Sequence, residues 1–268
     1  MKKVLVLDID GTLTNSQKII TRKTKKAIID AMKRGHKVML ASGRPTPGMK
    51  RYAEELELSH YDGYLLSFNG GKIIHCKTGE IIFQKVLPSV VISSLYKFAI
   101  DNNCGLITYL GDDIILATEK DEYIEIESKI NGMECKKVNH FVEYVSDYNL
   151  NKMLMMAPPE KAAVLVEELQ EKYKDVLSIY RSEPFFIEIM PKNVDKATSL
   201  DIMLTSLGMT KDNAICCGDG FNDKSMIEYA GVGVAMENAQ PAVKEVADYI
   251  TKSNDEDGIV DVIDKFIL

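Results

Sequence analysis

Short apolar runs alternate with amphipathic stretches in the N-terminal third of the chain. The runs Lys3–Leu7, Lys37–Ala41 and Gly63–Phe68 are nearly continuous in apolar residues, which is typical of strands buried on both faces of a sheet. Between them, apolar residues after Thr21 recur at helical spacing, and Pro47–Glu57 is predicted to form a second helix. This order of strands and helices predicts a doubly wound, Rossmann-like α/β fold on a parallel sheet.

The same alternation returns after residue 190. Lys196–Leu207 is predicted to be a helix that ends at Gly208, and Asn213–Cys217 is predicted to be the next buried strand. The elements expected after it are a helix at Asn222–Ala230, a strand at Val232–Ala235, and helices at Pro241–Ala247 and Gly258–Ile267. The two ends of the chain, residues 1–84 and 191–268, are therefore expected to form one α/β core.

The middle of the chain has a different order of elements. A hairpin is expected at Lys72–His75 and Glu80–Val86, and from about Pro88 to Met190 paired strands are interrupted by helices. This pattern is typical of an α+β arrangement, with helices on one face of an antiparallel sheet. We expect residues 85–190 to be an inserted second domain, with hinge motion near residues 83–88 and 190–193.

Polar residues follow the predicted core strands at their carboxyl ends, where open α/β sheets bind ligands. Asp8 and Asp10 follow the first strand, Ser42 follows the second, and Asp219 follows a later one. Lys196 opens a helix of the same core. Carboxylates, a lysine and a small hydroxyl group that converge on one pocket predict magnesium-assisted phosphoryl transfer.

Asp8 and Asp10 have the spacing of two side chains on the same side of a strand. Their carboxylate oxygens suit Mg²⁺, which keeps several waters and takes few protein ligands. Asp8 is a candidate nucleophile that would form an aspartyl-phosphate. Asp10 is a candidate general acid that would protonate the leaving oxygen and then activate water. The alternative interpretation is a pair of solvated acids at a turn.

Four segments together resemble the motifs of the haloacid dehalogenase superfamily of phosphohydrolases. They occur in the family's order and span nearly the whole chain: Asp8-Ile9-Asp10-Gly11-Thr12-Leu13, Ser42, Lys196, and Gly218-Asp219-Gly220-Phe221-Asn222-Asp223. Three further segments resemble the Cof-type sugar-phosphatase subfamily: Ala41-Ser42-Gly43-Arg44-Pro45, Phe68-Asn69-Gly70-Gly71 and residues 231–239. That subfamily carries an α/β cap of the C2B type between the second and third motifs, where residues 85–190 lie.

The resemblance implies a role for each matching position. Mg²⁺ would be held by the carboxylate of the nucleophile Asp8, the main-chain carbonyl of the general acid Asp10, and Asp219. The residues implied to bind the phosphoryl group are Ile9, Ser42, Gly43 through its amide, Lys196 and Asn222. Asp223 would orient Lys196 or a metal-bound water, with Thr12 in support. Ala197 stands where the family has a glycine, a mild departure because alanine is small and suits a helix.

Several of these residues also have purely structural interpretations. Lys196 alone is compatible with a solvated lysine at a helix start, behind a capping Asp195. Arg44 either binds substrate or pairs with a carboxylate, and pairing is the favoured interpretation. Asn69-Gly70 is interpreted as a hairpin turn rather than as part of the catalytic set. Asn222 and its neighbour are also suited to capping a helix, whose N-terminus favours anions in any case.

Composition narrows the choice of partners. A chain of 268 residues, 46% hydrophobic and 27% charged, can bury the cores of two domains. Its net charge of −7 argues against a general nucleic-acid binder, which needs a basic face. The five cysteines form no CxxC pair, which argues against a disulfide framework or a thiolate zinc site. Without a signal peptide or a membrane-spanning run, we expect a cytoplasmic protein with no nucleic-acid, membrane or protein partner implied.

The sequence thus predicts a Mg²⁺-dependent phosphoric monoester hydrolase that acts on a small phosphorylated metabolite. The inserted domain would govern access, and hexose phosphates are the first choice because the subfamily resemblance points to them. Pyridoxal phosphate remains open as a substrate. A phosphomutase or phosphotransferase that passes the phosphoryl group to an alcohol remains open as an activity. A non-enzymatic protein with the same fold is disfavoured, because every expected catalytic position is filled.

Overall fold

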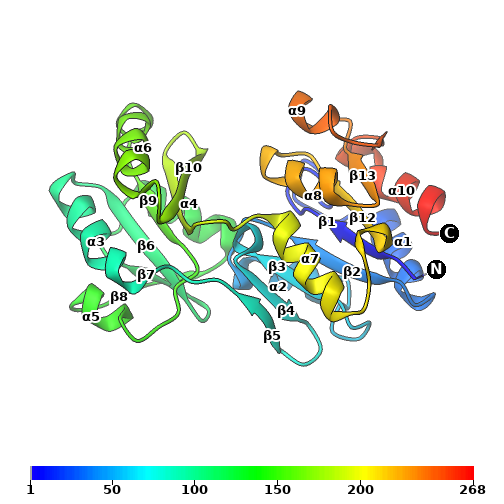
Figure 1. The fold of residues 1–268 in the computed structure, drawn as a ribbon, viewed down its shortest axis with the longest axis horizontal. Helices are drawn as coiled ribbons and strands as arrows, with labels where there is room; N and C mark the ends of the chain where they lie inside the picture. Colours follow the sequence, from blue (N-terminus) through cyan, green and yellow to red (C-terminus); the bar gives the residue numbers. More distant parts are fainter. Residues whose placement is uncertain (1) are drawn as a thin grey trace. The chain divides into compact units, whose positions relative to one another are not determined.

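The computed structural model describes residues 2–268, which form two compact units (Figure 1). Among the described residues, unit 1 comprises 2–83 and Asp195–Leu268, and unit 2 is the segment Gln84–Val194 between them. The first crossing lies one residue before the expected boundary at 84/85, and the second lies four residues after the one at 190/191. The last strand of unit 2 ends at Pro191, and the residues between it and helix α7 up to Val194 are grouped with unit 2. Each unit has a hydrophobic core of its own.

Unit 1 is built on an eight-stranded sheet with the order β14-β13-β12-β1-β2-β3-β4-β5. Neighbouring strands from β14 to β3 are parallel, and β4 runs antiparallel to β3. The strands are β1 (Val4–Leu7), β2 (Lys37–Ala41), β3 (Tyr64–Ser67), β4 (Lys72–His75), β5 (Ile81–Gln84), β12 (Ala214–Gly218), β13 (Val232–Ala235) and β14 (Tyr249–Ile250). The doubly wound α/β fold expected from the alternating pattern is confirmed.

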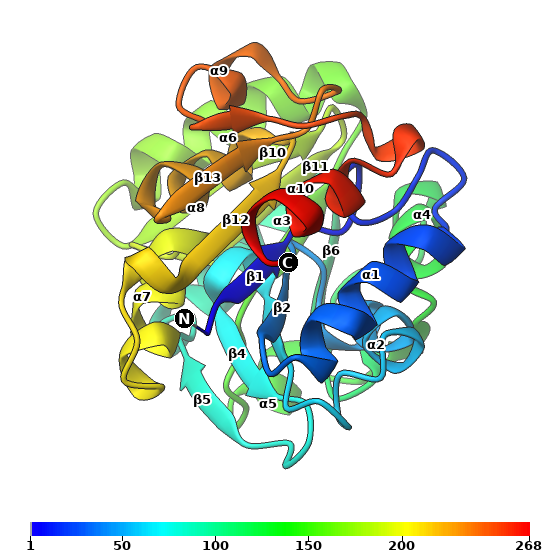
Figure 2. The same cartoon turned by 90° about the vertical axis from the view of Figure 1, so that its right-hand side faces the viewer.

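Helices cover both faces of this sheet (Figure 2). Helices α1 and α10 contact each other on one face, and α7 and α8 do the same on the other. The helices of unit 1 are α1 (Arg22–Lys33), α2 (Thr46–Glu55), α7 (Lys196–Ser206), α8 (Lys224–Tyr229), α9 (Pro241–Lys244) and α10 (Gly258–Phe266). Because both faces are covered, the central strand β1 is apolar at every position and fully buried.

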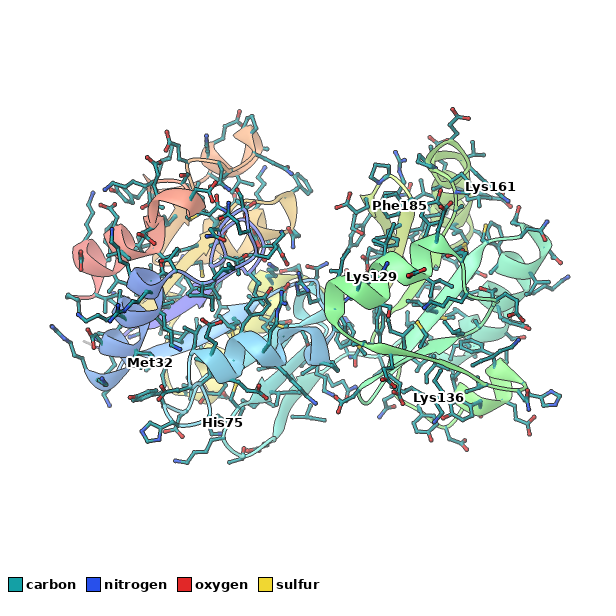
Figure 3. All side chains as sticks on the ribbon, turned by 180° about the vertical axis from the view of Figure 1, so that it is seen from behind. Met32, His75, Lys129, Lys136, Lys161 and Phe185 are labelled. Atoms are coloured by element: carbon teal, nitrogen blue, oxygen red, sulfur yellow. The ribbon has the colours of Figure 1, made fainter. Side chains whose placement is uncertain are left out.

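Helix α1 begins and packs as its sequence predicts. Thr21 caps it, because the Thr21 side-chain oxygen accepts a hydrogen bond of 3.1 Å from the amide of Thr24. Ile28 and Met32, four residues apart, are buried on the inner face of the helix (Met32 is labelled in Figure 3). Gly35 follows the end of the helix with φ of 89°, a left-handed conformation that glycine adopts without strain.

The order in which successive strands are added to the sheet reverses between β1 and β12. β1 pairs with β2 on one side and with β12 on the other, so that Leu7 lies opposite both Leu40 and Cys217. The strands that follow β1 extend the sheet to one edge, and those that follow β12 extend it to the other. The loops after β1 and β12 therefore leave the sheet side by side. Such a switch point is where open α/β sheets bind ligands.

Unit 2 is an α+β unit around a six-stranded sheet with the order β10-β11-β9-β6-β7-β8. Its neighbouring strands are antiparallel except for β7 and β8. Its strands are β6 (Gly105–Leu110), β7 (Asp113–Leu116), β8 (Glu134–Lys137), β9 (Met153–Met156), β10 (Leu177–Glu183) and β11 (Phe186–Pro191). Its helices are α3 (Ile92–Asp101), α4 (Glu122–Asn131), α5 (Phe141–Val145) and α6 (Pro159–Tyr173). Apolar residues of α3 and α6 pack with Leu106 of the sheet in one core.

The cysteines behave as small apolar residues. All five are free, and Cys216 and Cys217 are fully buried in β12. Burial raises the pKa of both thiols, so neither is a reactive thiolate. None of the helices described between residues 2 and 268 has the length and apolarity needed to cross a membrane.

Candidate active site

Asp8 stands at the carboxyl end of β1, where the central strand leaves the sheet. Its amide donates a hydrogen bond of 3.0 Å to the carbonyl of Cys217, which continues the pairing of β1 with β12 by one residue. The Asp8 side chain is buried, with 6% of its surface exposed. A carboxylate with so little contact with water needs cationic or N–H partners.

Lys196 supplies the first of these partners. It is the first residue of α7, it is fully buried, and its ammonium group donates to Asp8 Oδ1 at 2.7 Å and to Asp223 Oδ1 at 2.5 Å. A third bond of 2.8 Å goes to the carbonyl of Ala41, at the end of β2. Burial alone lowers the pKa of an ammonium group, but Asp223 and Asp8 outweigh this effect and raise the pKa of Lys196. The interpretation of Lys196 as a solvated lysine is wrong.

Asp223 has both of its carboxylate oxygens occupied. Oδ1 accepts the bond from Lys196, and Oδ2 accepts bonds of 3.0 Å from the amides of Asp219 and Gly220. Asp223 thus shapes the turn after β12 and at the same time orients Lys196. The sequence interpretation of Asp223 as a partner of the lysine describes its contacts, whereas its side chain makes no capping hydrogen bond to the helix α8 that follows.

Asp219 and Thr12 connect the loops after β12 and β1. The Thr12 hydroxyl donates to Asp219 Oδ1 at 2.7 Å. Gly11, which precedes Thr12, has φ of 88°, and a Cβ atom on it would stand 2.4 Å from Asp219 Oδ2. Only glycine tolerates both this backbone conformation and this close approach. The Gly-Thr part of the first motif is therefore explained by the packing of the two loops.

The carboxylates suit a divalent cation. In the described part of the chain, Asp8, Asp219 and Asp223 are the only group of three or more potential metal ligands, with ligand atoms within 4.8 Å of one another. Asp223 has its oxygens occupied, whereas Asp8 Oδ2 and Asp219 Oδ2 accept no hydrogen bond from any residue between Lys2 and Leu268. Two hard oxygen donors at the mouth of a buried acidic cluster fit Mg²⁺.

Burial and mutual repulsion raise the pKa of two of these carboxyl groups. Burial raises the pKa of Asp219 to about 6, helped by Asp223 and opposed by the hydrogen bond from Thr12. Burial and the Asp223 charge also raise the pKa of Asp8, against the attraction of Lys196. A divalent cation between Asp8 and Asp219 would lower the pKa of both groups, since its charge favours the ionised carboxylates and opposes the effect of burial.

The side chain of Asp10 is directed away from this cluster. Arg44 donates to its two oxygens, from Nε at 2.7 Å and from Nη2 at 2.9 Å, and Lys18 donates at 3.0 Å. Burial raises the pKa of Asp10, but these cations outweigh it and lower the pKa to about 2. Only the main-chain carbonyl of Asp10, as the family resemblance implied, remains a candidate for the metal. Arg44 pairs with a carboxylate, as favoured from the sequence.

The expected phosphate-binding residues form a second group at the end of β2. Ser42 is buried, and its amide bonds the carbonyl of Leu66 in β3 at 2.9 Å. Asn222 lies on the short 3₁₀ helix η4 (Phe221–Asp223), and its Nδ2 donates to Asn69 Oδ1 at 3.0 Å. A Cβ atom on Gly43 would stand 3.0 Å from the same oxygen, so Gly43 and Asn222 both lie next to Asn69.

Ile9 could contact a ligand only through its backbone. Its side chain is fully buried in the core of unit 1, and its carbonyl accepts bonds from the amide and the hydroxyl of Thr14 at 3.0 and 2.9 Å. A role in phosphate binding is therefore restricted to the Ile9 amide.

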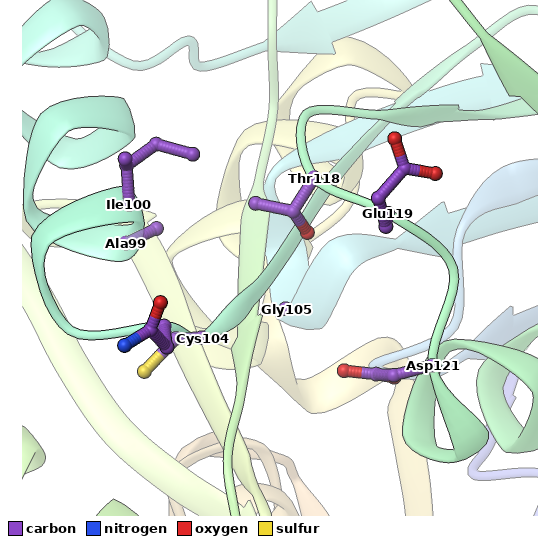
Figure 4. Close-up of a pocket in the computed structure, with 8 residues that line it drawn as sticks. Ala99, Ile100, Cys104, Gly105, Thr118, Glu119 and Asp121 are labelled. Atoms are coloured by element: carbon purple, nitrogen blue, oxygen red, sulfur yellow. The ribbon is translucent and has the colours of Figure 1, made fainter.

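Unit 2 offers no comparable cluster in its surface hollows. One of them, of about 270 Å³, lies between the end of α3 and the start of α4 and is partly lined by Cys104, Thr118, Glu119 and Asp121 (Figure 4). Asp121 serves there as the N-cap of α4, because it accepts a bond of 2.8 Å from the amide of Ile124. Burial raises the pKa of the Cys104 thiol. Of the two acidic residues that line the hollow, Asp121 is occupied as a helix cap and Glu119 is an exposed carboxylate paired with Lys137.

Residues 5–263 match the sequence profile of the haloacid dehalogenase-like hydrolases. The chain belongs to this family. Among its relatives, 5-amino-6-(5-phospho-D-ribitylamino)uracil phosphatase YcsE of Bacillus subtilis (strain 168) is 32% identical over 266 residues, which cover 99% of this chain and 96% of that protein. The family membership confirms the resemblance that the four motifs indicated, and with it the expectation of a hydrolase of the phosphatase kind.

Solved structures of the haloacid dehalogenase family share the whole fold. A haloacid dehalogenase-like hydrolase from Bacteroides thetaiotaomicron is 40% identical, with a TM-score of 0.93 and 99% of each chain covered. The subclass IIB sugar phosphatase BT4131 is 26% identical, with a TM-score of 0.83 and the same coverage. Both units of the present chain therefore have counterparts in these proteins.

Three residues in the site were not assigned to it from the sequence. Lys18 and Arg44 hold Asp10, and Asn69 bonds Asn222. Arg44 and Asn69 follow β2 and β3, so their position at the carboxyl ends of core strands was the available signal. Lys18 lies in a loop of polar residues, and nothing in its sequence context distinguishes it.

Proposed function

We propose that the protein is a Mg²⁺-dependent phosphatase that hydrolyses small phosphomonoesters, sugar phosphates first among them, through an aspartyl-phosphate on Asp8. The observation that carries the proposal is the buried cluster at the switch point of the sheet. There Asp8 is bonded to Lys196, and Asp219 stands close enough to share a cation with it. A nucleophile, a fixed positive charge and a metal site are the parts that phosphoryl transfer requires.

The first half of the reaction forms the aspartyl-phosphate. An Asp8 carboxylate oxygen attacks phosphorus, the bond from phosphorus to the ester oxygen breaks, and Asp10 protonates the departing alcohol. Lys196, Ser42 and the amide of Gly43 stabilise the charge on the equatorial oxygens. When bound, Mg²⁺ neutralises charge so that an anionic nucleophile can approach an anionic substrate.

The second half returns the enzyme to its starting state. Asp10, then deprotonated, accepts a proton from a water molecule, the water oxygen attacks phosphorus, and the bond to Asp8 breaks with release of inorganic phosphate. Ionised Asp10, which Arg44 stabilises, suits this step. For the first half, Asp10 must leave Arg44 and take up a proton, because the guanidinium group favours the charged carboxylate.

The relatives support small phosphomonoesters as substrates. BT4131 is described as a sugar phosphatase, and YcsE as a phosphatase of a phosphorylated ribitylaminouracil. Both substrates carry a phosphate on a polyhydroxylated carbon chain. We propose sugar phosphates for this chain on that basis, with unit 2 as the cap that selects the leaving group. Pyridoxal phosphate hydrolysis and phosphoryl transfer to an alcohol are the competing activities.

The test is a panel of phosphomonoesters assayed for phosphate release, with Mg²⁺ and with EDTA. We expect the highest kcat/KM on a sugar phosphate and loss of turnover in EDTA. A preference for pyridoxal phosphate would identify the first competitor. Consumption of substrate only when an alcohol acceptor is present, with formation of the phosphorylated alcohol in place of inorganic phosphate, would identify the second.

The matched variant in this panel is Asp8→Asn, which keeps the size of the side chain. We expect it to reduce kcat by about 10⁴-fold or more while the circular dichroism spectrum is unchanged, since removal of a nucleophile abolishes the covalent route. Residual turnover within about tenfold of the wild type would overturn the assignment of Asp8, because a tenfold change corresponds to only about 1.4 kcal/mol of barrier.

A further inference from the structure

The segment between β3 and β4 has an unusual backbone. Phe68, Asn69 and Gly70 have φ of 54°, 51° and 104°, three consecutive residues in the left-handed half of conformational space. A non-glycine residue there costs about 1 kcal/mol or more and persists only where surrounding contacts fix it, often at functional sites. Phe68 is especially unfavourable because its side chain is bulky. The contacts made by this segment, which we call the left-handed segment (Phe68–Gly70), explain why it is retained.

The left-handed segment braces the loop after β2. The amide of Phe68 donates to the carbonyl of Arg44, and the amide of Asn69 donates to the carbonyl of Ser42, both at 3.0 Å. These two bonds run on either side of Gly43, whose amide is the one proposed to bind phosphate. Because adjacent amides of the segment point to the same loop, the positions of Ser42 and Gly43 are fixed by the unusual backbone.

The same segment also braces the helix that carries Lys196. The Gly70 carbonyl accepts a bond of 2.6 Å from the hydroxyl of Ser199, which lies in α7 and is buried. A Cβ atom on Gly70 would stand 2.4 Å from the carbonyl oxygen of Asp195, so only glycine permits this approach. The N-terminus of α7, and with it Lys196, is thus held against the left-handed segment.

The third contact is made by the side chain of Asn69. Its Oδ1 accepts the bond from Asn222 Nδ2 and lies next to Gly43. Asn222 is exposed, so without this bond its amide group would rotate freely in water. Asn and Asp both tolerate the left-handed conformation, but a carboxylate at this place would repel a phosphate ion.

We propose that Asn69 is a positioning residue, which orients the Asn222 amide group and, through the left-handed segment, the Gly43 amide toward the phosphoryl group. This inference rests on the proposed function, since it assumes that phosphate binds there. It adds to the site a residue that follows β3 and belongs to none of the four motifs. Asn69 acts through its neighbours and needs no contact with the reacting atoms.

The test separates the Asn69 side chain from its backbone. Asn69→Gly keeps the left-handed conformation and removes the side chain. Asn69→Asp keeps an acceptor for Asn222 and adds a charge. Asn103→Gly is the matched control, because Asn103 is also left-handed, with φ of 46°, but lies in unit 2. The affinity for inorganic phosphate with Mg²⁺ is measured by calorimetry, together with KM, kcat and thermal unfolding.

We expect Asn69→Gly to raise the Kd for phosphate about fivefold, the effect of losing one neutral hydrogen bond. Asn69→Asp should raise it further, by about tenfold or more, because the added charge repels the ligand. Asn103→Gly should leave the Kd unchanged. In a double-mutant cycle, Asn69→Gly should have little further effect once Asn222→Ala is present.

Independent, additive effects of Asn69→Gly and Asn222→Ala on the Kd would overturn the inference, and so would an Asn69→Asp variant that binds phosphate as the wild type does. A wild type that binds phosphate but shows no turnover would overturn the proposed function alone, and the cycle would still decide the role of Asn69. A wild type that binds no phosphate would overturn both.

Discussion

Buried charge is the dominant feature of the site at the scale of single residues. Asp8, Asp219 and Asp223 converge, and Lys196 is the one cation bonded to this group within residues 2–268. An uncompensated buried charge is costly, so an excess of carboxylates over cations implies either protonation or a bound metal. The pKa of Asp219, raised to about 6, makes its protonation easier than for a free carboxyl group, and the proposed Mg²⁺ would offset the same excess of negative charge.

Protons and Mg²⁺ should therefore compete for Asp219. Its pKa of about 6 in the metal-free fold lies above the usual pKa of an aspartate, about 3.9, so this group stabilises the metal-free fold fully below pH about 4, and the contribution is lost as the pH rises through about 6. Mg²⁺ binding needs the deprotonated form. We expect the apparent Kd for Mg²⁺, measured by calorimetry, to rise about tenfold for each pH unit below 6 and to level off above 7.

The control for this pH dependence is Asp10→Asn, because Asp10 is ionised across the whole range and points to Arg44. Its Mg²⁺ titration should show the same slope below pH 6 as the wild type. A Kd that is constant between pH 5 and 7 would contradict the assignment of Asp219 as a ligand.

At the scale of elements, the N-terminus of α7 determines where Lys196 points. Asp195 caps the helix, with Oδ1 accepting from the Thr198 amide and Oδ2 from the Thr198 hydroxyl, both at 2.9 Å. Lys196 is the next residue, so fraying of the first turn would move its ammonium group away from Asp8. The sequence interpretation of Asp195 as a helix cap is confirmed, and the cap serves the site indirectly.

Asp195→Ala should accordingly affect stability and activity together. We expect it to lower the free energy of unfolding by about 1 kcal/mol, the usual effect of losing an N-cap, as measured by urea denaturation. We also expect kcat to fall more than KM rises, because Lys196 is proposed to stabilise the transferring group. Asp195→Ser, which keeps a capping oxygen, should recover both quantities. A variant with unchanged stability and turnover would show that the first turn of α7 holds without its cap.

The sequence predicted most elements of the sheet and its helices because burial leaves a clear pattern. The buried strand β1 and helix α7 match their expected ranges to within one residue. Within the expected α+β segment, residues 131–151 show no clear hydrophobic period, yet β8 and α5 lie there. β8 is an edge strand with three exposed residues, so no hydrophobic period marks it. An edge strand forms because the neighbouring strand has backbone N–H and C=O groups that need partners. The sequence of the edge strand carries no sign of those groups.

At the scale of the whole molecule, the chain consists of two units with separate hydrophobic cores. The residues proposed for the metal and the phosphoryl group all belong to unit 1, although residues 84–194 separate Asp8 from Lys196 along the chain. The two chain segments on either side of the insertion therefore form one complete fold, unit 1. Binding of metal and selection of substrate are expected to be separable functions.

Replacing Gln84–Val194 with a flexible Gly/Ser linker tests this separation. We expect the shortened protein to bind Mg²⁺ with a Kd within about twofold of the wild type, as for independent sites. Its kcat/KM values across the phosphomonoester panel should become similar to one another, because the leaving group would no longer be selected. Circular dichroism checks that unit 1 is folded. Equal losses of Mg²⁺ binding and of substrate preference would contradict the separation.

The sequence by itself determined the layered fold, the inserted segment and the family, because apolar periodicity and four short motifs are local properties of the chain. Only the tertiary structure decided which side chains meet. It paired Asp10 with Arg44 and Lys18, enclosed Lys196 between Asp8 and Asp223, and placed Asn69 beside Asn222. These contacts join residues up to 188 positions apart. Their geometry follows from the reversal of strand order at β1 and β12, which no local pattern encodes.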